Sequence, residues 1–265
     1  MYSFDYHQAT SLADAVQKLS QDEEASLLAG GQTLIPTLKQ RLAMPTMLVD
    51  ISRIDDLDFI RLDADTLIIG AGTCHATVAA SQTCLDHIPA LADLASHIGD
   101  PAVRHRGTLG GSIANNDPSS DYPAAALALG ATIVTTTREL AADEFFTGLF
   151  ETALEPGEIV SELRFPKPSR AVYLKFPNPA SRYAMVGVFI AQSSNGPRVA
   201  VTGASQEGVF RWTELETKLA QDWSTNALSG LSLKGDAMLS DLHGDGDYRA
   251  HLVTVMAKRA LEALA

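Results

Sequence analysis

The sequence has too few residues of several kinds for some common functions. It contains two cysteines, Cys74 and Cys84, and these cannot supply the four ligands of an iron–sulfur cluster or a structural zinc site. Basic residues are also scarce, since 20 Lys and Arg stand against 32 Asp and Glu, giving a formal net charge of −12. This balance argues against nucleic acid or an anionic membrane surface as the main partner, because both are bound by clustered Lys and Arg.

Long apolar runs are missing as well. No run approaches the ~18 apolar residues of a membrane span. The first residues, "MYSFDYHQAT", lack the basic and apolar regions of a signal peptide. We therefore expect a cytoplasmic protein whose two thiols stay reduced. Only 7 histidines are present, and no Ser-His-Asp set or acid/base pair stands out, so we name no catalytic side chain and no metal ligand.

The remaining composition is that of a globular protein. The chain has 265 residues, of which 46% are hydrophobic and 20% charged. This length predicts one large domain or two smaller ones, with enough residues to bury a core.

Two glycine pairs stand out, in "AGGQT" (29–33) and in "RGTLGGS" (106–112). Adjacent glycines beside a hydroxyl residue expose successive N–H groups, which makes an anion-binding nest. Either pair alone is also compatible with a tight turn that binds nothing. Two nests from separate segments would suit the two charged groups of a diphosphate. Neither segment has the spacing of a Rossmann or P-loop motif, and Lys39 lies too far into its helix to act as a P-loop lysine.

The first 52 residues predict a βαβ unit. Ser11 and Asp14 have the spacing of a capping box at the start of a helix. "ASLLAG" and "TMLVDI" are typical of short buried strands, and Thr33 is a candidate N-cap for a helix over "LIPTLKQRLA". The first glycine pair thus falls at a strand-to-helix turn, where the helix dipole favours an anion.

The middle of the chain mixes strands and helices. We expect strands at "TLIIGAGT" and "ATIVTTT", and helices over 76–98 with a break near Pro89. We expect "RHRGTLGGSIANNDPSS" to be a loop with one short strand. Asp121 is a candidate N-cap for a small helix over "YPAAALALG".

After Pro156-Gly157 the pattern becomes that of antiparallel strands. "EIVSELRFP", "VYLKF", "AMVGVFIA" and "RVAVTGA" alternate, and Asn195-Gly196 predicts a hairpin between the last two. The tail, "DYRAHLVTVMAKRALEALA", predicts an amphipathic helix. We place a domain boundary near residue 170, which divides the chain into 1–170 and 171–265.

Two long segments carry a family resemblance. "LLAGGQTLIPTLKQRLAMPTMLVDI" and "RHRGTLGGSIANNDPSSDYPAAALALGA" closely resemble the FAD-binding medium subunit of the molybdenum hydroxylases, the xanthine dehydrogenase and carbon monoxide dehydrogenase group. The resemblance continues through "FFTGLFETALEPGEIVSELRFP" and "YLKFPNPASRYAMVGV" to "DLHGDGDYRAHLVTVMAKRAL", so it covers nearly the whole chain. It implies an α+β fold. The expected parts are a two-subdomain FAD-binding module of the vanillyl-alcohol oxidase and MurB type over 1–170, and a small antiparallel sheet with helices over 171–265.

The resemblance also implies a site, with the FAD diphosphate held between the two glycine segments. The implied cofactor-binding residues are Leu28, Ala29, Gly30, Gly31, Gln32, Thr33, Leu34, Ile35, Thr108, Leu109, Gly110, Gly111, Ser112, Asp121, Val160 and Lys175. A lysine near the flavin would stabilise the anionic reduced ring. Each single residue also has a simpler interpretation: Asp121 as a helix cap, Val160 as a buried strand residue, and Lys175 as a solvated surface lysine.

Other residues near these motifs leave alternatives open. Tyr183 either stacks near the flavin ring or lies in the core. His75 is interpreted as a loop or helix-start residue, and Cys74 as a small packed hydrophobe. Asn115-Asn116 either add hydrogen bonds near the cofactor or only shape a turn. Gln32 stands where related oxidases with covalent FAD often have a histidine, so we expect dissociable FAD.

The implied function is that of an FAD-carrying electron-transfer subunit in which the flavin is the redox group. Electrons would come from [2Fe-2S] clusters on a small partner subunit and go to an external acceptor, while a large molybdopterin subunit oxidises the substrate. The expected assembly is a heterotrimer doubled to a heterohexamer. A self-sufficient FAD-dependent oxidase and a scaffold that has lost FAD are the alternatives. Xanthine, carbon monoxide, an aldehyde or an N-heterocycle would all be compatible substrates of the complex.

Overall fold

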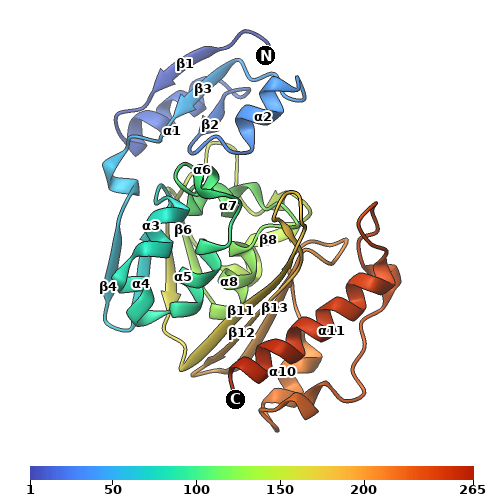
Figure 1. The fold of residues 1–265 in the computed structure, drawn as a ribbon. Coiled ribbons are helices and arrows are strands. Elements are labelled where there is room, and N and C mark those ends of the chain that lie inside the picture. The colour runs from blue at the N-terminus through green and yellow to red at the C-terminus, as the bar shows by residue number, and fades with distance from the viewer.

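A computed structural model describes all 265 residues and arranges them in three sheet-based units (Figure 1). The N-terminal unit lies at one end of the molecule, above the helices of the middle unit. The C-terminal sheet packs beside the middle unit and carries the long helix at the end of the chain (Figure 1). None of the helices is long and apolar enough to cross a membrane.

The N-terminal unit is a parallel three-stranded sheet in the order β1-β3-β2 with two helices. Its elements are β1 (Asp5–Gln8), α1 (Leu12–Gln21), β2 (Ser26–Leu28), α2 (Leu34–Lys39) and β3 (Met47–Asp50). The predicted βαβ unit is confirmed, because β2 and β3 are parallel and α2 joins them. The predicted cap of α1 is also confirmed: Ser11 Oγ accepts from the N–H of Asp14 at 3.1 Å.

The helix after the first glycine pair differs from its prediction in two ways. Thr33 stands at the N-cap position of α2, but its side chain caps nothing, so the predicted cap is wrong. The helix also ends at Lys39 rather than continuing over "QRLA". Arg41 has a φ of 60°, a left-handed conformation that a helix cannot continue through.

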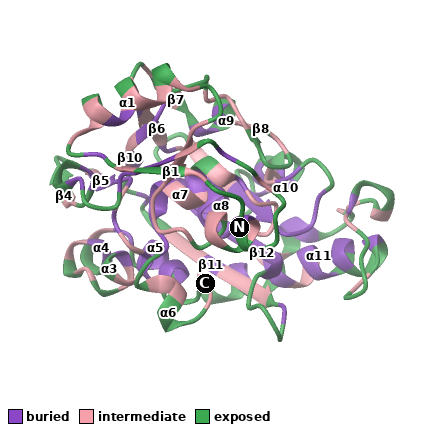
Figure 2. Ribbon diagram, turned by 90° about the horizontal axis from the view of Figure 1, so that it is seen from above, coloured by how far each residue is buried: buried purple, intermediate pink, exposed green.

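The middle unit is an antiparallel five-stranded sheet in the order β4-β5-β10-β6-β7, packed with helices. Its strands are β4 (Ile60–Asp63), β5 (Thr66–Gly70), β6 (Thr132–Thr135), β7 (Glu139–Ala141) and β10 (Val160–Pro166), with a small ribbon of β8 (Phe146–Gly148) and β9 (Glu151–Thr152). Its helices are η1 (Asp55–Leu57), α3 (His75–Ala80), α4 (Gln82–His87), α5 (Pro89–Ser96), α6 (Pro101–Arg104), α7 (Leu109–Asn115), α8 (Tyr122–Leu129) and α9 (Ala142–Phe145). Helix α8 is buried along its whole length, near the centre of the molecule (Figure 2).

The second glycine segment was expected to be a loop with one short strand, and this is wrong. Residues 109–115 form helix α7, and residues 101–104 form α6. Thr108 caps α7, since its Oγ1 accepts from the N–H of Gly111 at 3.1 Å. Two adjacent glycines have low helix propensity, so the sequence pattern did not predict this helix. Asn116 ends α7 in a left-handed conformation, and its side chain donates to the carbonyls of Gly148 and Glu151, so it shapes the turn.

The C-terminal unit is an antiparallel sheet in the order β11-β12-β13-β14. Its elements are β11 (Arg170–Pro177), β12 (Ala184–Ser193), β13 (Gly196–Thr202), β14 (Phe210–Arg211), α10 (Thr213–Leu219), η2 (Thr225–Leu228), η3 (Gly235–Ala237) and α11 (Gly246–Ala263). The hairpin at Asn195-Gly196 and the C-terminal helix are confirmed. The proposed boundary at residue 170 falls where β10 gives way to β11.

The C-terminal sheet contributes to two cores. Phe189, Ala191 and Ala200 join the core of the middle unit, whereas Val188 and Ile190 join a separate core beneath α10 and α11. Alternate residues of a strand point to opposite faces, which explains this division along β12. The two faces of the sheet therefore belong to two different cores, and side chains of β11 and β13 can reach into the middle unit.

Candidate functional site

The two glycine segments, far apart in sequence, lie directly against each other. A Cβ built on Gly30 would lie only 1.9 Å from the carbonyl oxygen of Arg106 and 2.8 Å from Cα of Gly107. Main-chain atoms cannot move aside as a flexible side chain can. Gly30 is therefore needed for the close approach of the two segments. In Figure 1 the loop before α2 accordingly faces α6 and α7 of the middle unit.

The first segment has main-chain donors that the fold does not use. The N–H groups of residues 30–34 have no main-chain acceptor. Gly31 adopts a φ of 72°, the left-handed conformation of a nest, and the side chains of Gln32 and Thr33 are exposed. This row of amides at the start of α2 can receive an anion without breaking any hydrogen bond of the protein.

Most main-chain donors of the second segment are already used within the protein. Leu109 N–H donates to Thr73 O at 3.0 Å, and Gly110 N–H donates to Ala71 O at 2.8 Å. The N–H of Gly111 donates to its own cap, Thr108. The expectation of a second row of free amides is therefore wrong. What this segment offers instead is close approach, because a Cβ built on Gly111 would meet only Thr108 Oγ1, at 2.9 Å.

Asp121 and Lys175 form a buried ion pair. Their closest atoms, Oδ1 and Nζ, lie 3.0 Å apart, and the two side chains are only 4% and 7% exposed. The interpretation of Asp121 as a helix cap is wrong, because its side chain makes no capping bond. The interpretation of Lys175 as a solvated lysine is wrong as well. Lys175 also donates to the carbonyl of His97 at 2.8 Å.

The surroundings of Asp121 act on its charge in opposite directions. Burial raises the pKa of the carboxyl, whereas the Lys175 ammonium and a hydrogen bond from Tyr173 lower it. The Tyr173 hydroxyl donates to Asp121 Oδ1 at 2.5 Å. Sequence reasoning did not identify Tyr173. The signal was present, since Tyr173 and Lys175 are two residues apart on β11 and so face the same side.

A row of contacts connects the second glycine segment to this pair. The hydroxyls of Ser112 and Ser120 are 2.5 Å apart, and Ser120 directly precedes Asp121. This contact links the second glycine segment to the chain that leads into Asp121. Val160 is buried at the start of β10 and pairs with Thr135. Its burial within a strand agrees with the buried-strand interpretation.

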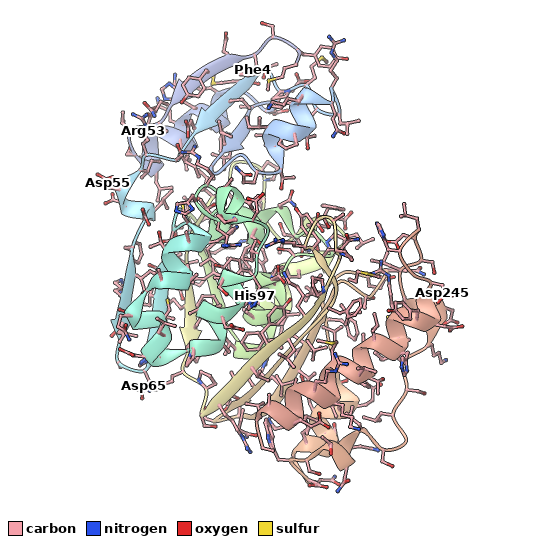
Figure 3. The ribbon with its side chains drawn as sticks, in the orientation of Figure 1. Phe4, Arg53, Asp55, Asp65, His97 and Asp245 are labelled. Atoms are coloured by element: carbon pink, nitrogen blue, oxygen red, sulfur yellow. The ribbon has the colours of Figure 1, made fainter.

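A cavity of about 440 Å³ opens beside Lys175, between α5, α6 and the segment after β11. Its lining includes one acidic residue, Asp93, and four basic residues: His97, Arg104, Lys175 and Arg182. His97 lies near the centre of the molecule, between the helices of the middle unit and the C-terminal sheet (Figure 3). This volume is within the range of small-molecule sites.

Three further residues were considered in the sequence. Tyr183 is 49% exposed on the segment between β11 and β12, so its core interpretation is wrong. Burial, followed by the charges of Asp117 and Asp121, raises the pKa of the Tyr183 hydroxyl. His75 is the first residue of α3, as expected, while Cys74 is only partly buried. Both cysteines are free thiols.

Comparison with known proteins identifies the family. Residues 2–168 match the family model described as the FAD binding domain in molybdopterin dehydrogenase. The carbon monoxide dehydrogenase medium chain of Hydrogenophaga pseudoflava is 34% identical, over 98% of this chain and 96% of its own length. The chain belongs to the family of FAD-binding medium subunits of the molybdenum hydroxylases. The resemblance and the FAD cofactor inferred from the sequence are thereby confirmed.

Other members of this medium-subunit family are also similar to this chain over nearly its whole length. The nicotine 6-hydroxylase medium subunit of Paenarthrobacter nicotinovorans is 31% identical, over 97% of this chain and 95% of its own length. The solved carbon monoxide dehydrogenase of Hydrogenophaga pseudoflava superposes with a TM-score of 0.88 at 34% identity, over 99% of this chain and 97% of that chain. These relatives are subunits of oxidoreductase complexes, and the α+β fold with an FAD-binding module is confirmed. This chain is therefore an oxidoreductase subunit.

Proposed function

We propose that this medium subunit binds FAD between its two glycine segments and serves as the electron outlet of a molybdenum hydroxylase. Electrons enter from [2Fe-2S] clusters of a small partner subunit and leave to an external acceptor, while a large molybdopterin subunit oxidises the substrate. The proposed assembly is a doubled heterotrimer. The observation that carries the proposal is the direct contact of the two glycine segments, with unused amides on one side of it.

The residues present fit FAD. The unused N–H groups of residues 30–34 suit the charged oxygens of the diphosphate, because they are main-chain donors at a helix start. Gly111 leaves room for a ligand to approach the wall formed by Thr108–Ser112. The buried Lys175 ammonium would supply positive charge near the flavin ring, whose reduced form is an anion. We propose the segment 28–35, the segment 108–112, Asp121 and Lys175 as the site, with Val160 as a buried neighbour.

The protein contributes orientation and charge in this proposal, and FAD when bound supplies the one- and two-electron chemistry. The first segment would bind the diphosphate through main-chain N–H groups. These groups do not titrate, so their contribution to FAD affinity does not depend on pH. Lys175 keeps its ammonium in place through Asp121 and the His97 carbonyl. Gln32 provides no ring nitrogen for a covalent bond, so FAD is held by non-covalent contacts alone.

Purification of the chain together with the products of its neighbouring genes tests the proposal. We expect a yellow preparation whose flavin is released as free FAD on denaturation, and which contains iron and molybdenum on separate subunits. Substrate should then bleach the flavin only when all three subunits are present. A chain that purifies without flavin overturns the proposal. A yellow chain that oxidises a substrate by itself would instead support a self-sufficient oxidase.

A further inference from the structure

We propose that Tyr173 is a positioning residue of this cofactor site. Its hydroxyl holds the Asp121 carboxylate, and Asp121 in turn holds the Lys175 ammonium, so the C-terminal sheet controls a charge pair at the FAD-binding module. The inference rests on the proposed function, since it concerns how the FAD site is assembled. It adds a residue that neither the glycine motifs nor the family resemblance identified.

The geometry places all three groups in one buried cluster. Tyr173 is 3% exposed, and its hydroxyl lies 2.5 Å from Asp121 Oδ1. Lys175 contacts the same carboxylate from the same face of β11, with Nζ 3.0 Å from Oδ1. Since a carboxylate inside a protein is stable as an anion only when it is paired and hydrogen-bonded, both donors are needed to fix it.

A glycine in the neighbouring strand makes room for this hydroxyl. Gly187 stands in the interior of β12, where glycine weakens a strand. A Cβ built on Gly187 would lie 2.3 Å from the Tyr173 hydroxyl oxygen and 2.9 Å from Thr202 Cγ2. The Tyr173 ring also packs on Phe189, with ring centroids 6.0 Å apart. Packing therefore fixes the ring, and the missing side chain at Gly187 leaves the space that the hydroxyl occupies.

The same sheet also holds the backbone that leads to Asp121. Thr202 Oγ1 donates to the carbonyl of Ser120 at 2.7 Å, and Gly203 N–H donates to the carbonyl of Pro118 at 2.8 Å. Strand β13 thus fixes the chain just before Asp121, while β11 fixes its carboxylate. The helix that Asp121 precedes makes no use of that carboxylate, so the contacts with the C-terminal sheet determine where it points.

The test is the FAD affinity of the full-length chain carrying Tyr173→Phe, which keeps the ring and removes only the hydroxyl. Titration of the apoprotein with FAD, followed by flavin fluorescence, should show a dissociation constant raised about tenfold, equal to ~1.4 kcal/mol. Tyr122→Phe is the matched control. Tyr122 is also fully buried and adjoins Asp121 in sequence, but its hydroxyl has no hydrogen-bond partner. Its loss should leave FAD affinity unchanged.

A double-mutant cycle separates positioning from general stability. In the Asp121→Ala background, which removes the acceptor, Tyr173→Phe should cause no further loss of FAD affinity, because the hydroxyl acts through that carboxylate. Gly187→Ala should reproduce the loss with the tyrosine retained, and it decides the matter if Tyr173→Phe does not fold. Unchanged affinity, or equal losses in both backgrounds, would overturn the inference. A wild-type chain that takes up no FAD would contradict the proposed function itself, which is a separate result.

Discussion

The two glycine segments have the same kind of sequence and opposite internal bonding. Both combine a Gly-Gly pair with a nearby hydroxyl residue, and both lead into a short helix. In the first, the amides of residues 30–34 have no main-chain acceptor, whereas in the second Leu109 and Gly110 donate to residues 71–73. The difference comes from what lies beside each segment. The end of β5 continues next to the second segment and presents its carbonyls, while no such strand faces the first.

This difference separates two roles that a glycine pair can have. The second segment has acceptors within the protein for most of its main-chain donors, so it keeps its conformation without a ligand. The first has unsatisfied donors, so a bound anion would stabilise it by mass action. Gly30 joins the two by allowing main-chain contact with Arg106. Substitutions at the two segments should therefore have different consequences for folding and for FAD binding.

The largest combined effect, on stability and on FAD uptake together, is expected at the contact between the segments. In Gly30→Ala the new methyl would overlap the Arg106 carbonyl, so the segments must separate. We expect a loss of about 2–3 kcal/mol in the free energy of unfolding, as for other overpacked sites, and loss of FAD uptake. Thermal unfolding and flavin content measure these effects. The control is Gly111→Ala, which adds the same methyl to the other pair where only the Thr108 hydroxyl is near. Equal stability of the two variants would contradict the role assigned to Gly30.

The second effect is a pH dependence of stability that arises beside the second segment, at His75. His75 is buried against Gly107, and burial, followed by the charge of Arg104, lowers its pKa from 6.5 to about 4. Its neutral form is therefore favoured in the folded state. Between pH 6.5 and 4 the unfolded chain binds a proton that the folded chain does not, so stability falls as the pH falls through this window. The loss reaches on the order of 3 kcal/mol near pH 4.

Urea unfolding at several pH values between 7 and 4 measures this loss. His75→Gln cannot titrate, so its stability should fall less steeply over the same range. The difference between the two curves isolates His75 from the carboxylates that also titrate below about pH 4.5. Parallel curves would show that His75 is not a source of acid sensitivity. The first segment, residues 29–35, contains no titratable side chain and offers no counterpart to this effect.

The asymmetry also shows what the sequence could and could not predict. The βαβ unit, the cap at Ser11 and the hairpin at Asn195-Gly196 depend on residues close together in the chain, and these predictions were confirmed. Helix α7 was missed because its two glycines weaken the helical pattern. The acceptors that stabilise its first turn, residues 71–73, lie more than thirty residues earlier in the chain.

The contacts of Asp121 with Tyr173 and Lys175 could not be predicted from local sequence either, because the partners are far apart in the chain. Asp121 was interpreted as a helix cap because the residues after it are helical, but its partners Tyr173 and Lys175 follow about fifty residues later. For Tyr183 two interpretations were open, stacking near the flavin ring or lying in the core, and its loop leaves it half exposed. The residues alone predicted only two candidate anion sites. The family resemblance supplied FAD, and the structure supplied the contact between the segments.

A third, smaller effect tests whether the second segment lines the cofactor site. Gly111→Val adds bulk at the start of α7, where the one atom near a new Cβ is the Thr108 hydroxyl oxygen, and valine is better suited to a helix than glycine. We expect a stability close to that of the wild type, with FAD affinity lowered at least tenfold, or by ~1.4 kcal/mol. Fluorescence titration with FAD measures this. Full FAD affinity in a folded Gly111→Val chain would show that the second segment does not line the cofactor site.

The smallest effect is expected at the cap of the second segment. Thr108→Val keeps the shape of the side chain but removes the acceptor of the Gly111 N–H. Loss of such a cap costs about 1 kcal/mol, which chemical unfolding can resolve. FAD affinity should change little, because the hydroxyl is already engaged inside the protein and the first segment supplies the donors. The opposite result, unchanged stability with a large loss of affinity, would mean that Thr108 faces the ligand. The second segment would then bind the cofactor as directly as the first, and the contrast between them would disappear.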